Sequence, residues 1–199
     1  MTRLDASYRL CAQIARRHGK TYATAVRLLP SEARRHVQAI YAFCRLADDL
    51  VDTLDGRPVE ERARALAAFG RRFRADLADG RSDDPVLAAV VATVLATGVD
   101  PRCFDRSLRS MALDRTTVGY PTWEDLSGYM DGSAAVIGEM MLPVLGGDRQ
   151  LAFEPARQLG IAFQLTNFLR LPAWMWARVT ISWVESPCST SALVGWRGR

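Results

Sequence analysis

Apolar residues recur at intervals of three and four along most of the chain, a spacing that predicts amphipathic helices. Seven runs show this period: Ala6–Arg17, Glu32–Leu54, Val59–Leu77, Val86–Ala96, Arg102–Asp114, Trp123–Leu145 and Gln150–Leu169. Segments rich in Gly, Pro, Ser and Asp separate them, and strand-like alternation does not appear. The pattern therefore predicts an all-α fold, with Thr122 and Asp125 forming a capping box at the start of the sixth helix.

The last 29 residues depart from this pattern. They hold four of the five tryptophans and one acidic residue, Glu185, while Ser, Thr, Pro and Gly become frequent. Helical periodicity stops there, and such a composition does not predict a packed core. We therefore expect one helical domain over residues 1–170 and an aberrant, disordered tail over residues 171–199.

Composition adds bounds on function. The 199 residues are 49% hydrophobic, enough for a domain with a core, and the net charge of +4 comes from Arg spread along the chain. Dispersed Arg with interleaved acidic residues predicts solvated helix faces rather than a nucleic-acid partner. The longest apolar stretch, Val86–Val99, is too short to span a bilayer. We therefore expect a protein that is soluble or peripheral at a membrane. The four cysteines form no metal-binding or disulfide pattern, so we expect a cytoplasmic location. We expect no obligate protein partner.

A stripe of polar residues follows one side of the predicted helix Glu32–Leu54. At about 100° per residue, Tyr41, Arg45, Asp48 and Asp52 fall within a narrow sector. The opposite side is apolar and consists of Ile40, Phe43, Ala47, Leu50, Val51 and Leu54. The helix is therefore expected to pack through one face while an Arg and two carboxylates point the other way.

The two carboxylates of this stripe, Asp48 and Asp52, lie one helical turn apart, with Cβ atoms about 5–6 Å from each other. Magnesium takes one or two protein carboxylates and completes its shell with water and substrate phosphates. Arg45 would meet phosphate oxygens through its guanidinium fork. An exposed acidic patch, with Arg45 paired to Asp48 or Asp49, explains the same spacing, so the spacing alone leaves both readings open.

A second polar stripe lies on the predicted helix Gln150–Leu169. Gln164 and Asn167 share one face, with Arg170 at its flank. These amides either hydrogen-bond to each other or to nearby backbone, or they complete a cation–phosphate shell opposite the first helix. Spacing does not choose between these readings.

The segment Gly132–Leu145 is apolar almost all round, which predicts a buried helix. Its small residues Ser133, Ala134, Ala135 and Gly138 leave room either for close helix packing or for a bound hydrocarbon chain.

Four motifs in this order resemble the squalene/phytoene synthase family, which condenses isoprenoid diphosphates head to head. They are Thr21–Pro30 with Arg34; Tyr41-x-x-x-Arg45-x-x-Asp48-x-x-x-Asp52; Tyr120-Pro121-Thr122-Trp123 with Tyr129 and the Gly132–Gly146 segment; and Gln164-x-x-Asn167-x-x-Arg170. The third is most similar to bacterial phytoene synthases. The resemblance covers roughly residues 5–170 and implies an isoprenoid-synthase-type helical bundle around a central cavity, truncated here.

The resemblance also implies roles for these residues. Asp48 and Asp52 would bind Mg²⁺, with Mn²⁺ as a substitute, bridging to a prenyl diphosphate; Tyr41 would lie beside the reacting carbons. Arg45 would be both catalytic and substrate-binding, and the other substrate-binding residues would be Tyr129, Gln164, Asn167 and Arg170. The implied reaction joins two geranylgeranyl diphosphates through a cyclopropyl intermediate to give phytoene, without NADPH.

Two other functions remain open. One is squalene-type synthesis from farnesyl diphosphate, in which a nicotinamide cofactor supplies hydride. The other is a non-catalytic relative that serves as an assembly or interaction protein, since the family contains such members.

The resemblance stops abruptly after Arg170. The family continues with Asp and, four residues on, a second Asp, whereas this chain reads Leu171-Pro172-Ala173-Trp174. The second metal-binding half and roughly the last third of the family fold are missing. We therefore expect little synthase activity, and apolar faces left exposed by the missing helices.

The codons implied by the tail suggest a cause. Trp174-Met175-Trp176-Ala177 must be encoded TGG ATG TGG GCN, and reading from the third base gives Asp-Val-Gly. The family motif runs Asn-Phe-Leu-Arg-Asp-Val-Gly. We hypothesise a frameshift just after Arg170; sequencing the gene tests it, because an open frame downstream must then encode family-like helices.

Overall fold

The computed structural model describes residues 2–18, 20–52, 58–114 and 120–169, and every regular element in them is helical. The elements are α1 (Arg3–His18), α2 (Lys20–Val26), α3 (Ser31–Asp52), α4 (Val59–Ala78), α5 (Pro85–Thr97), α6 (Pro101–Asp114), α7 (Trp123–Met130), the π-helical turn η1 (Asp131–Ala135), α8 (Val136–Val144) and α9 (Arg149–Leu169). The all-α prediction and its seven helices are confirmed. The sequence pattern missed α2, whose seven residues are too few to show a helical period.

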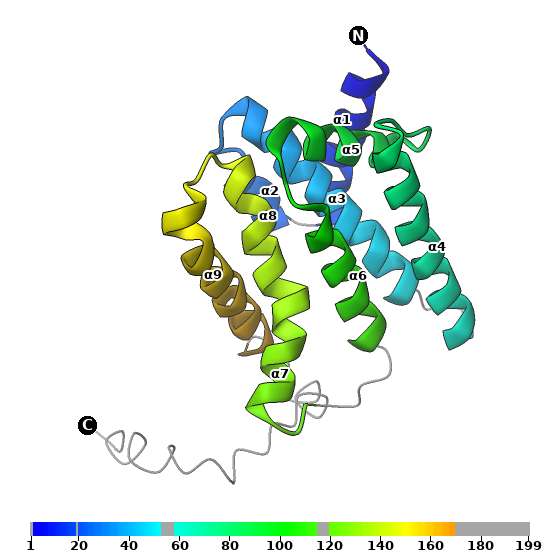
Figure 1. The fold of residues 1–199 in the computed structure, drawn as a ribbon. Coiled ribbons are helices and arrows are strands. Elements are labelled where there is room, and N and C mark those ends of the chain that lie inside the picture. Colours follow the sequence, from blue (N-terminus) through cyan, green and yellow to red (C-terminus); the bar gives the residue numbers. More distant parts are fainter. Residues whose placement is uncertain (1, 19, 53–57, 115–119, 170–199) are drawn as a thin grey trace.

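Helix α5 lies among α1, α3 and α4 and is buried on most sides. Asp84 caps its N-terminus by accepting hydrogen bonds from the amides of Val86 and Leu87, and Gly98 ends it in the left-handed conformation at φ 70°. In Figure 1 α5 lies at the upper end of the bundle, and α8 and α9 lie on the other side of α3 and α6. None of the described helices combines the length and apolar character needed to cross a membrane.

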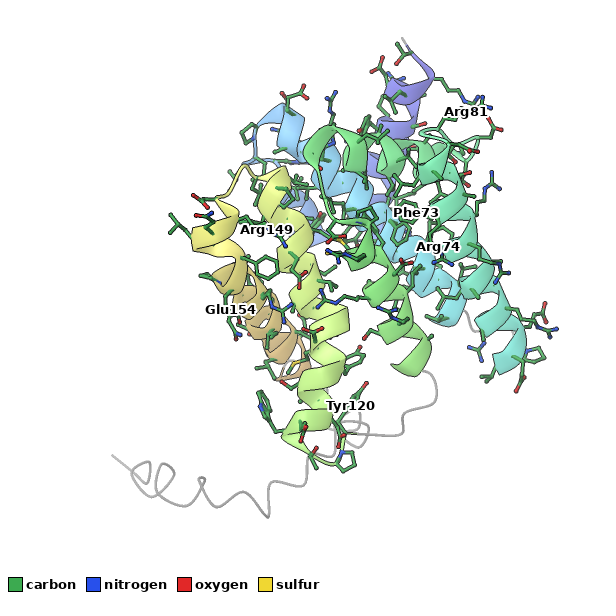
Figure 2. All side chains as sticks on the ribbon, in the orientation of Figure 1. Phe73, Arg74, Arg81, Tyr120, Arg149 and Glu154 are labelled. Carbon is green, nitrogen blue, oxygen red and sulfur yellow. The ribbon has the colours of Figure 1, made fainter. Side chains whose placement is uncertain are left out.

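Aromatic side chains join three helices in the core. Phe43 of α3 lies 5.1 Å from Phe73 of α4 and 4.8 Å from Phe104 of α6, measured between ring centroids. All three rings are fully buried, and Phe73 lies inside the bundle (Figure 2). Aromatic pairs at these separations contribute beyond their buried area. The apolar side predicted for the residue 32–54 helix is therefore the side that meets the core.

Helices α7 and α8 continue each other through the π-helical turn η1. The capping box at the start of α7 is confirmed, because the side chain of Thr122 accepts from the amide of Asp125 and the Asp125 carboxylate accepts from the amide of Thr122. Ala135, Val136 and Met140 are fully buried, as predicted for this apolar segment. The hydrogen bonds of a π-helical turn enclose one residue more than those of an α-helical turn, so η1 rotates the side chains of α7 about the helix axis relative to those of α8. Turns of this kind are common at functional sites.

Helix α9 approaches α8 and the turn η1 before it so closely that glycine is required at both contacts. A Cβ atom added at Gly138 would overlap the carbonyl of Ala156, and one added at Gly160 would overlap the carbonyl of Ala134. The small residues of this segment thus serve close helix packing at Ala134 and Gly138, the first of the two readings offered by the sequence.

His36 of α3 is buried in a polar cluster with Tyr8 of α1 and Thr93 of α5. Its Nδ1 lies 3.0 Å from Thr93 Oγ1 and 3.3 Å from Tyr8 Oη, and these two oxygens are 3.2 Å apart. Burial lowers the pKa of His36 below its ordinary value, and the nearby charge of Arg35 acts in the same direction. The folded protein therefore favours the neutral imidazole.

We predict that Gly138→Ala and Gly160→Ala each lower the free energy of unfolding by about 1–3 kcal/mol, the usual cost of overpacking. Gly128→Ala is the matched control, because a Cβ there meets no atom within 4 Å and should stabilise the helix by roughly 0.5–1 kcal/mol. Urea unfolding monitored by circular dichroism measures all three. Wild-type stability in the Gly138 and Gly160 variants would contradict the close contact.

The His36 cluster predicts acid sensitivity. Its contribution to stability is complete above the unfolded-state pKa of about 6.5 and decreases, by up to about 1.4 kcal/mol per pH unit, as the pH falls through the lower folded-state pKa. Urea unfolding between pH 7.5 and 5 should show this loss in the wild type and in His18→Gln but not in His36→Gln. An NMR titration midpoint of His36 at or above 6.5 would show the prediction to be wrong.

Candidate functional site

The predicted polar stripe occupies one side of α3. Tyr41, Arg45 and Asp48 are half-buried, whereas the apolar residues of the other side, among them Ile40, Phe43, Ala47 and Val51, are buried. The division into two faces agrees with the sequence. Asp52 is the last residue of α3, and its side chain lies outside the described part of the structure.

Arg45 forms an ion pair with Asp49, one turn further along α3. This is one of the two helix pairs that the sequence allowed. The pair does not use the whole guanidinium, however, because the Nε atom of Arg45 is buried and has no hydrogen-bond partner among the described residues. An unsatisfied donor of this kind costs free energy unless a ligand or water fills it. Arg45 is therefore suited to receive an anionic oxygen.

Tyr41 is held by the corner between α2 and α3. Its ring stacks on Tyr22, with centroids 4.5 Å apart and planes 23° apart, and the Tyr22 hydroxyl donates to the carbonyl of Val37 at 3.0 Å. Burial raises the pKa of Tyr41, so its phenol stays neutral at neutral pH. Arg34 fixes the turn before α3 by donating to the carbonyls of Arg27 and Leu29 at 2.9 and 2.8 Å. The motif Thr21–Pro30 with Arg34 thus positions Tyr41, the aromatic side chain of the polar stripe.

The second predicted stripe lies near the end of α9. Gln164 is half-buried and Asn167 is exposed, while Arg170 lies outside the described residues. The other side of α9 is apolar, as predicted: Ile161, Leu165 and Phe168 pack against a small core of Tyr120, Leu126 and Met130. The side-chain amides of Gln164 and Asn167 therefore lie on a side of α9 that α7 does not cover.

The two stripes come from helices that end at the same end of the bundle. Both α3 and α9 run from the upper to the lower end in Figure 1, and α8 contacts both of them. The structure therefore groups Tyr41, Arg45 and Asp48 on one helix and Gln164 and Asn167 on another, with α8 between the two.

Tyr129 belongs to a different hollow. A cavity of about 820 Å³ is lined by residues of α6 and α7 and by residues on either side of α7, including Arg106, Arg109, Tyr120, Glu124 and Tyr129. The Tyr129 ring lies 4.9 Å from that of Tyr120, which Figure 2 shows at the lower end of the bundle. None of the predicted α3 residues lines this cavity. Tyr129 also reaches toward α9, since its ring centroid lies 6.5 Å from that of Phe168.

Sequence reasoning missed a network of four charged residues that joins α6, η1, α8 and α9. Arg106 Nη1 lies 2.8 Å from Glu139 Oε2, and Arg106 Nη2 lies 2.6 Å from Asp131 Oδ2. Arg157 pairs with the same two carboxylates, at 2.5 Å from Asp131 Oδ1 and with Glu139 Oε1. Two guanidinium groups thus share two carboxylates across the π-helical turn.

The Glu139 side chain is 7% exposed, so it depends on these partners for its charge. Burial raises the pKa of Asp131, but hydrogen bonds from Arg157 and Arg106 outweigh it, and the pKa lies below its ordinary value. One sequence signal could have indicated the network: Glu139 is the only charged residue in the apolar segment Gly132–Leu145, and a buried carboxylate requires a cationic partner.

The donor set on α3 fits a magnesium–diphosphate group better than a metal ion alone. The described residues contain no cluster of three or more His, Cys, Asp or Glu side chains that would hold a metal by themselves. Magnesium needs few protein carboxylates when substrate phosphates complete its shell, and the unpaired Nε of Arg45 lies on the same helix face as Asp48. These residues would hold a cation only together with an anionic substrate.

Comparison with known proteins gives a consistent result. The family model described as squalene/phytoene synthase matches residues 15–178. The chloroplastic phytoene synthase of Daucus carota is 33% identical over 173 residues, which are 84% of this chain and 43% of that protein. The phytoene synthase of Pseudescherichia vulneris is 33% identical over 157 residues, 76% of this chain and 51% of that protein. This chain therefore spans about half the length of the curated relatives it matches.

Solved structures show the same fold. The crystal structure of a dehydrosqualene synthase in complex with ligand has a TM-score of 0.76 and 29% identity, covering 84% of this chain and 57% of that one. The squalene synthase HpnC from Alicyclobacillus acidocaldarius has a TM-score of 0.75 and 26% identity, covering 83% and 61%.

The charge network predicts that Glu139→Gln lowers the free energy of unfolding by about 3 kcal/mol, because two half-buried guanidinium groups lose a shared carboxylate. Arg74→Gln is the control: it breaks the more exposed pair with Asp105 and should cost less than about 1 kcal/mol. Thermal and urea unfolding measure both. Equal costs in the two variants would contradict a structural role for the network.

Proposed function

Because this chain belongs to the squalene/phytoene synthase family, we propose that α3 forms one wall of a magnesium-dependent, head-to-head prenyltransferase site of phytoene-synthase type. The observation that carries the proposal is the polar face of α3. Arg45 presents a buried, unpaired Nε there, one turn before Asp48 and two turns before Asp52. That arrangement supports binding of a diphosphate together with its cation.

The chemistry of such a site begins with the loss of diphosphate from an allylic carbon. Diphosphate leaves more easily when a cation and a guanidinium neutralise its negative charge, and Mg²⁺ would supply the cation when bound. Arg45 would supply the guanidinium, and Asp48 and Asp52 would hold the cation. Tyr41, packed on Tyr22 and kept neutral by burial, places an aromatic face near the same helix, where it would stabilise a carbocation by cation–π attraction.

The second wall would come from α9. Gln164 and Asn167 offer amide groups that would orient diphosphate or its hydration shell, and Arg170 would add a phosphate contact. The family resemblance adds Tyr129 as a substrate-binding residue, but its ring lies near Phe168, on the apolar side of α9 away from these amides. In the printed sequence Leu171 stands where the family has the first carboxylate of this wall. We therefore propose that this polypeptide binds the first diphosphate but does not turn it over.

Geranylgeranyl diphosphate is the substrate we propose, because relatives named phytoene synthase share about a third of their residues with this chain over its matched part. The solved neighbours named as dehydrosqualene and squalene synthases make farnesyl diphosphate the alternative. The depth of the hydrocarbon cavity distinguishes the two substrates, so product identification distinguishes the two activities.

The test is binding of geranylgeranyl diphosphate to the purified 199-residue chain by calorimetry, with and without Mg²⁺. We expect Mg²⁺-dependent binding without phytoene formation. Arg45→Gln should weaken binding by about tenfold or more, since a charge-assisted hydrogen bond contributes about 1.5–3 kcal/mol. Arg71→Gln, an exposed position on α4, is the control and should leave binding unchanged.

In a second chain, residues 171–199 are replaced by the corresponding continuation of the Pseudescherichia vulneris enzyme. We expect this chain to release phytoene and diphosphate. Phytoene formation by the unmodified chain would contradict the proposed need for the second wall. If neither chain binds magnesium and diphosphate, the non-catalytic alternative is correct instead.

A further inference from the structure

The acidic residues that accompany Arg along most of the chain are missing from its first part. Six of the 26 Lys and Arg residues, but only one of the 22 Asp and Glu residues, lie in the first 31 positions. Between Asp5 and Glu32 the sequence has no acidic residue and five basic ones: Arg9, Arg16, Arg17, Lys20 and Arg27. The rest of the chain holds slightly more acidic than basic residues. The net positive charge therefore arises in the segment that contains α1 and α2.

Helix α1 gathers three of these arginines on one side. Arg9, Arg16 and Arg17 are exposed, as is Gln13 between them. At about 100° per residue the four side chains fall within a sector of about 100°, and from Arg9 to Arg17 they extend over about 12 Å of helix. We call these four residues the outer face of α1. The buried residues of the helix lie on the opposite side: Ser7, Tyr8, Cys11 and Ala15.

The three arginines of the outer face form no ion pair with any carboxylate in the described part of the chain. The acidic residue of α1, Asp5, lies in the first turn and accepts a hydrogen bond from the amide of Thr2 at 2.9 Å. Arg72 and Arg74 of α4, by contrast, pair with Asp76 and Asp105. The outer face of α1 therefore carries positive charge that the fold itself does not neutralise.

Helix stability does not account for this charge. Arg16 and Arg17 lie in the last turn of α1, where a cation interacts favourably with the helix dipole. Arg9 lies in the middle of the helix, where that interaction is negligible. A row of unpaired cations along a straight helix is instead typical of a surface that meets an extended negative charge.

An anionic bilayer fits this face better than a nucleic acid does. Lipid headgroups present negative charge as a plane, which a straight row of three arginines can follow, and each arginine near such a surface strengthens binding about fivefold. The outer face has no aromatic side chain that would stack on a base, the feature that usually accompanies basic residues in single-strand binding. The charge and the composition of the face both favour lipid.

We propose that the outer face of α1 binds the anionic headgroups of a phospholipid membrane. Arg9, Arg16 and Arg17 contact the headgroups, and the axis of α1 lies parallel to the membrane plane. The buried side of α1 keeps its contacts with α3 and α5, so the attachment is electrostatic and reversible. The proposal depends on charge and exposure alone, and it requires neither the proposed reaction nor Mg²⁺.

The first test is co-sedimentation of the full 199-residue chain with vesicles of phosphatidylcholine, either alone or mixed in equal parts with phosphatidylglycerol. We expect binding to the mixed vesicles only, and its loss at high salt, which screens the charges. The combined variant Arg9→Gln, Arg16→Gln and Arg17→Gln should lower the partition coefficient about 100-fold, because three contributions of about fivefold are lost.

The matched control removes the same charge elsewhere. Arg64, Arg71 and Arg81 are exposed on α4 and just after it, and the combined variant Arg64→Gln, Arg71→Gln and Arg81→Gln has the same net charge as the first variant. Its partition coefficient should fall less than about threefold, because charges beyond a screening length from the membrane contribute little. Equal losses in the two variants, or equal binding to both kinds of vesicle, would overturn the proposal. Binding of the wild-type chain to a DNA duplex but not to the mixed vesicles would also overturn it.

A second measurement reports the orientation of the bound chain. Gln13→Cys, at the centre of the outer face, and Ala68→Cys, exposed on α4, are each combined with Cys188→Ser and labelled with a fluorophore. Mixed vesicles that contain a nitroxide headgroup lipid should quench the fluorophore at position 13 but not the one at position 68. Equal quenching at the two positions, or quenching at position 68 alone, would contradict binding through the outer face of α1.

Discussion

The contact between α8 and α9 constrains the rest of the molecule more than any other interaction. The backbones meet at Gly138 and Gly160, where a single methyl group would overlap the carbonyl of Ala156 in α9 or of Ala134 in η1. Beside this contact Arg157 of α9 reaches across to Glu139 of α8, and Arg106 of α6 binds the same carboxylate. Close packing brings the charges within reach of each other, and the charges in turn fix how far α9 can rotate about its axis.

That constraint determines which side of α9 is available. With Arg157 turned inward and Ile161, Leu165 and Phe168 packed on the α7 core, Gln164 and Asn167 face away from α7. Leu159 and Phe163, on the remaining side of α9, are exposed. On the other side of α8, the core contacts of Phe43 set the rotation of α3, so that Arg45 and Asp48 lie away from the core. The geometry of both proposed walls thus follows from packing remote from the reacting groups.

Much of this could be predicted from the sequence because it depends on local periodicity. The apolar side of α3, the capping box at Thr122 and the buried segment after Gly132 all follow from spacing within one helix. The π-helical turn and the charge network could not, since Asp131 and Glu139 find their arginine partners 18 to 33 positions away, at distances set by tertiary packing. Arg106 and Arg157 instead suggested ordinary solvated helix faces, because their residue type alone carries no information about a buried partner. The location of Tyr129 in a cavity away from α3 likewise depends on how α6 and α7 meet.

The polar face of α3, and not the cavity beside α6 and α7, is where we propose that the diphosphate and its cation bind. Mn²⁺ with inorganic diphosphate tests this directly, because the paramagnetic ion broadens the NMR signals of nearby backbone amides in the full chain. We predict broadening centred on Arg45–Asp52 that requires diphosphate and disappears in Arg45→Gln. Broadening centred on the cavity residues Arg109 and Glu124, or broadening at α3 that is unchanged when diphosphate is omitted, would contradict it.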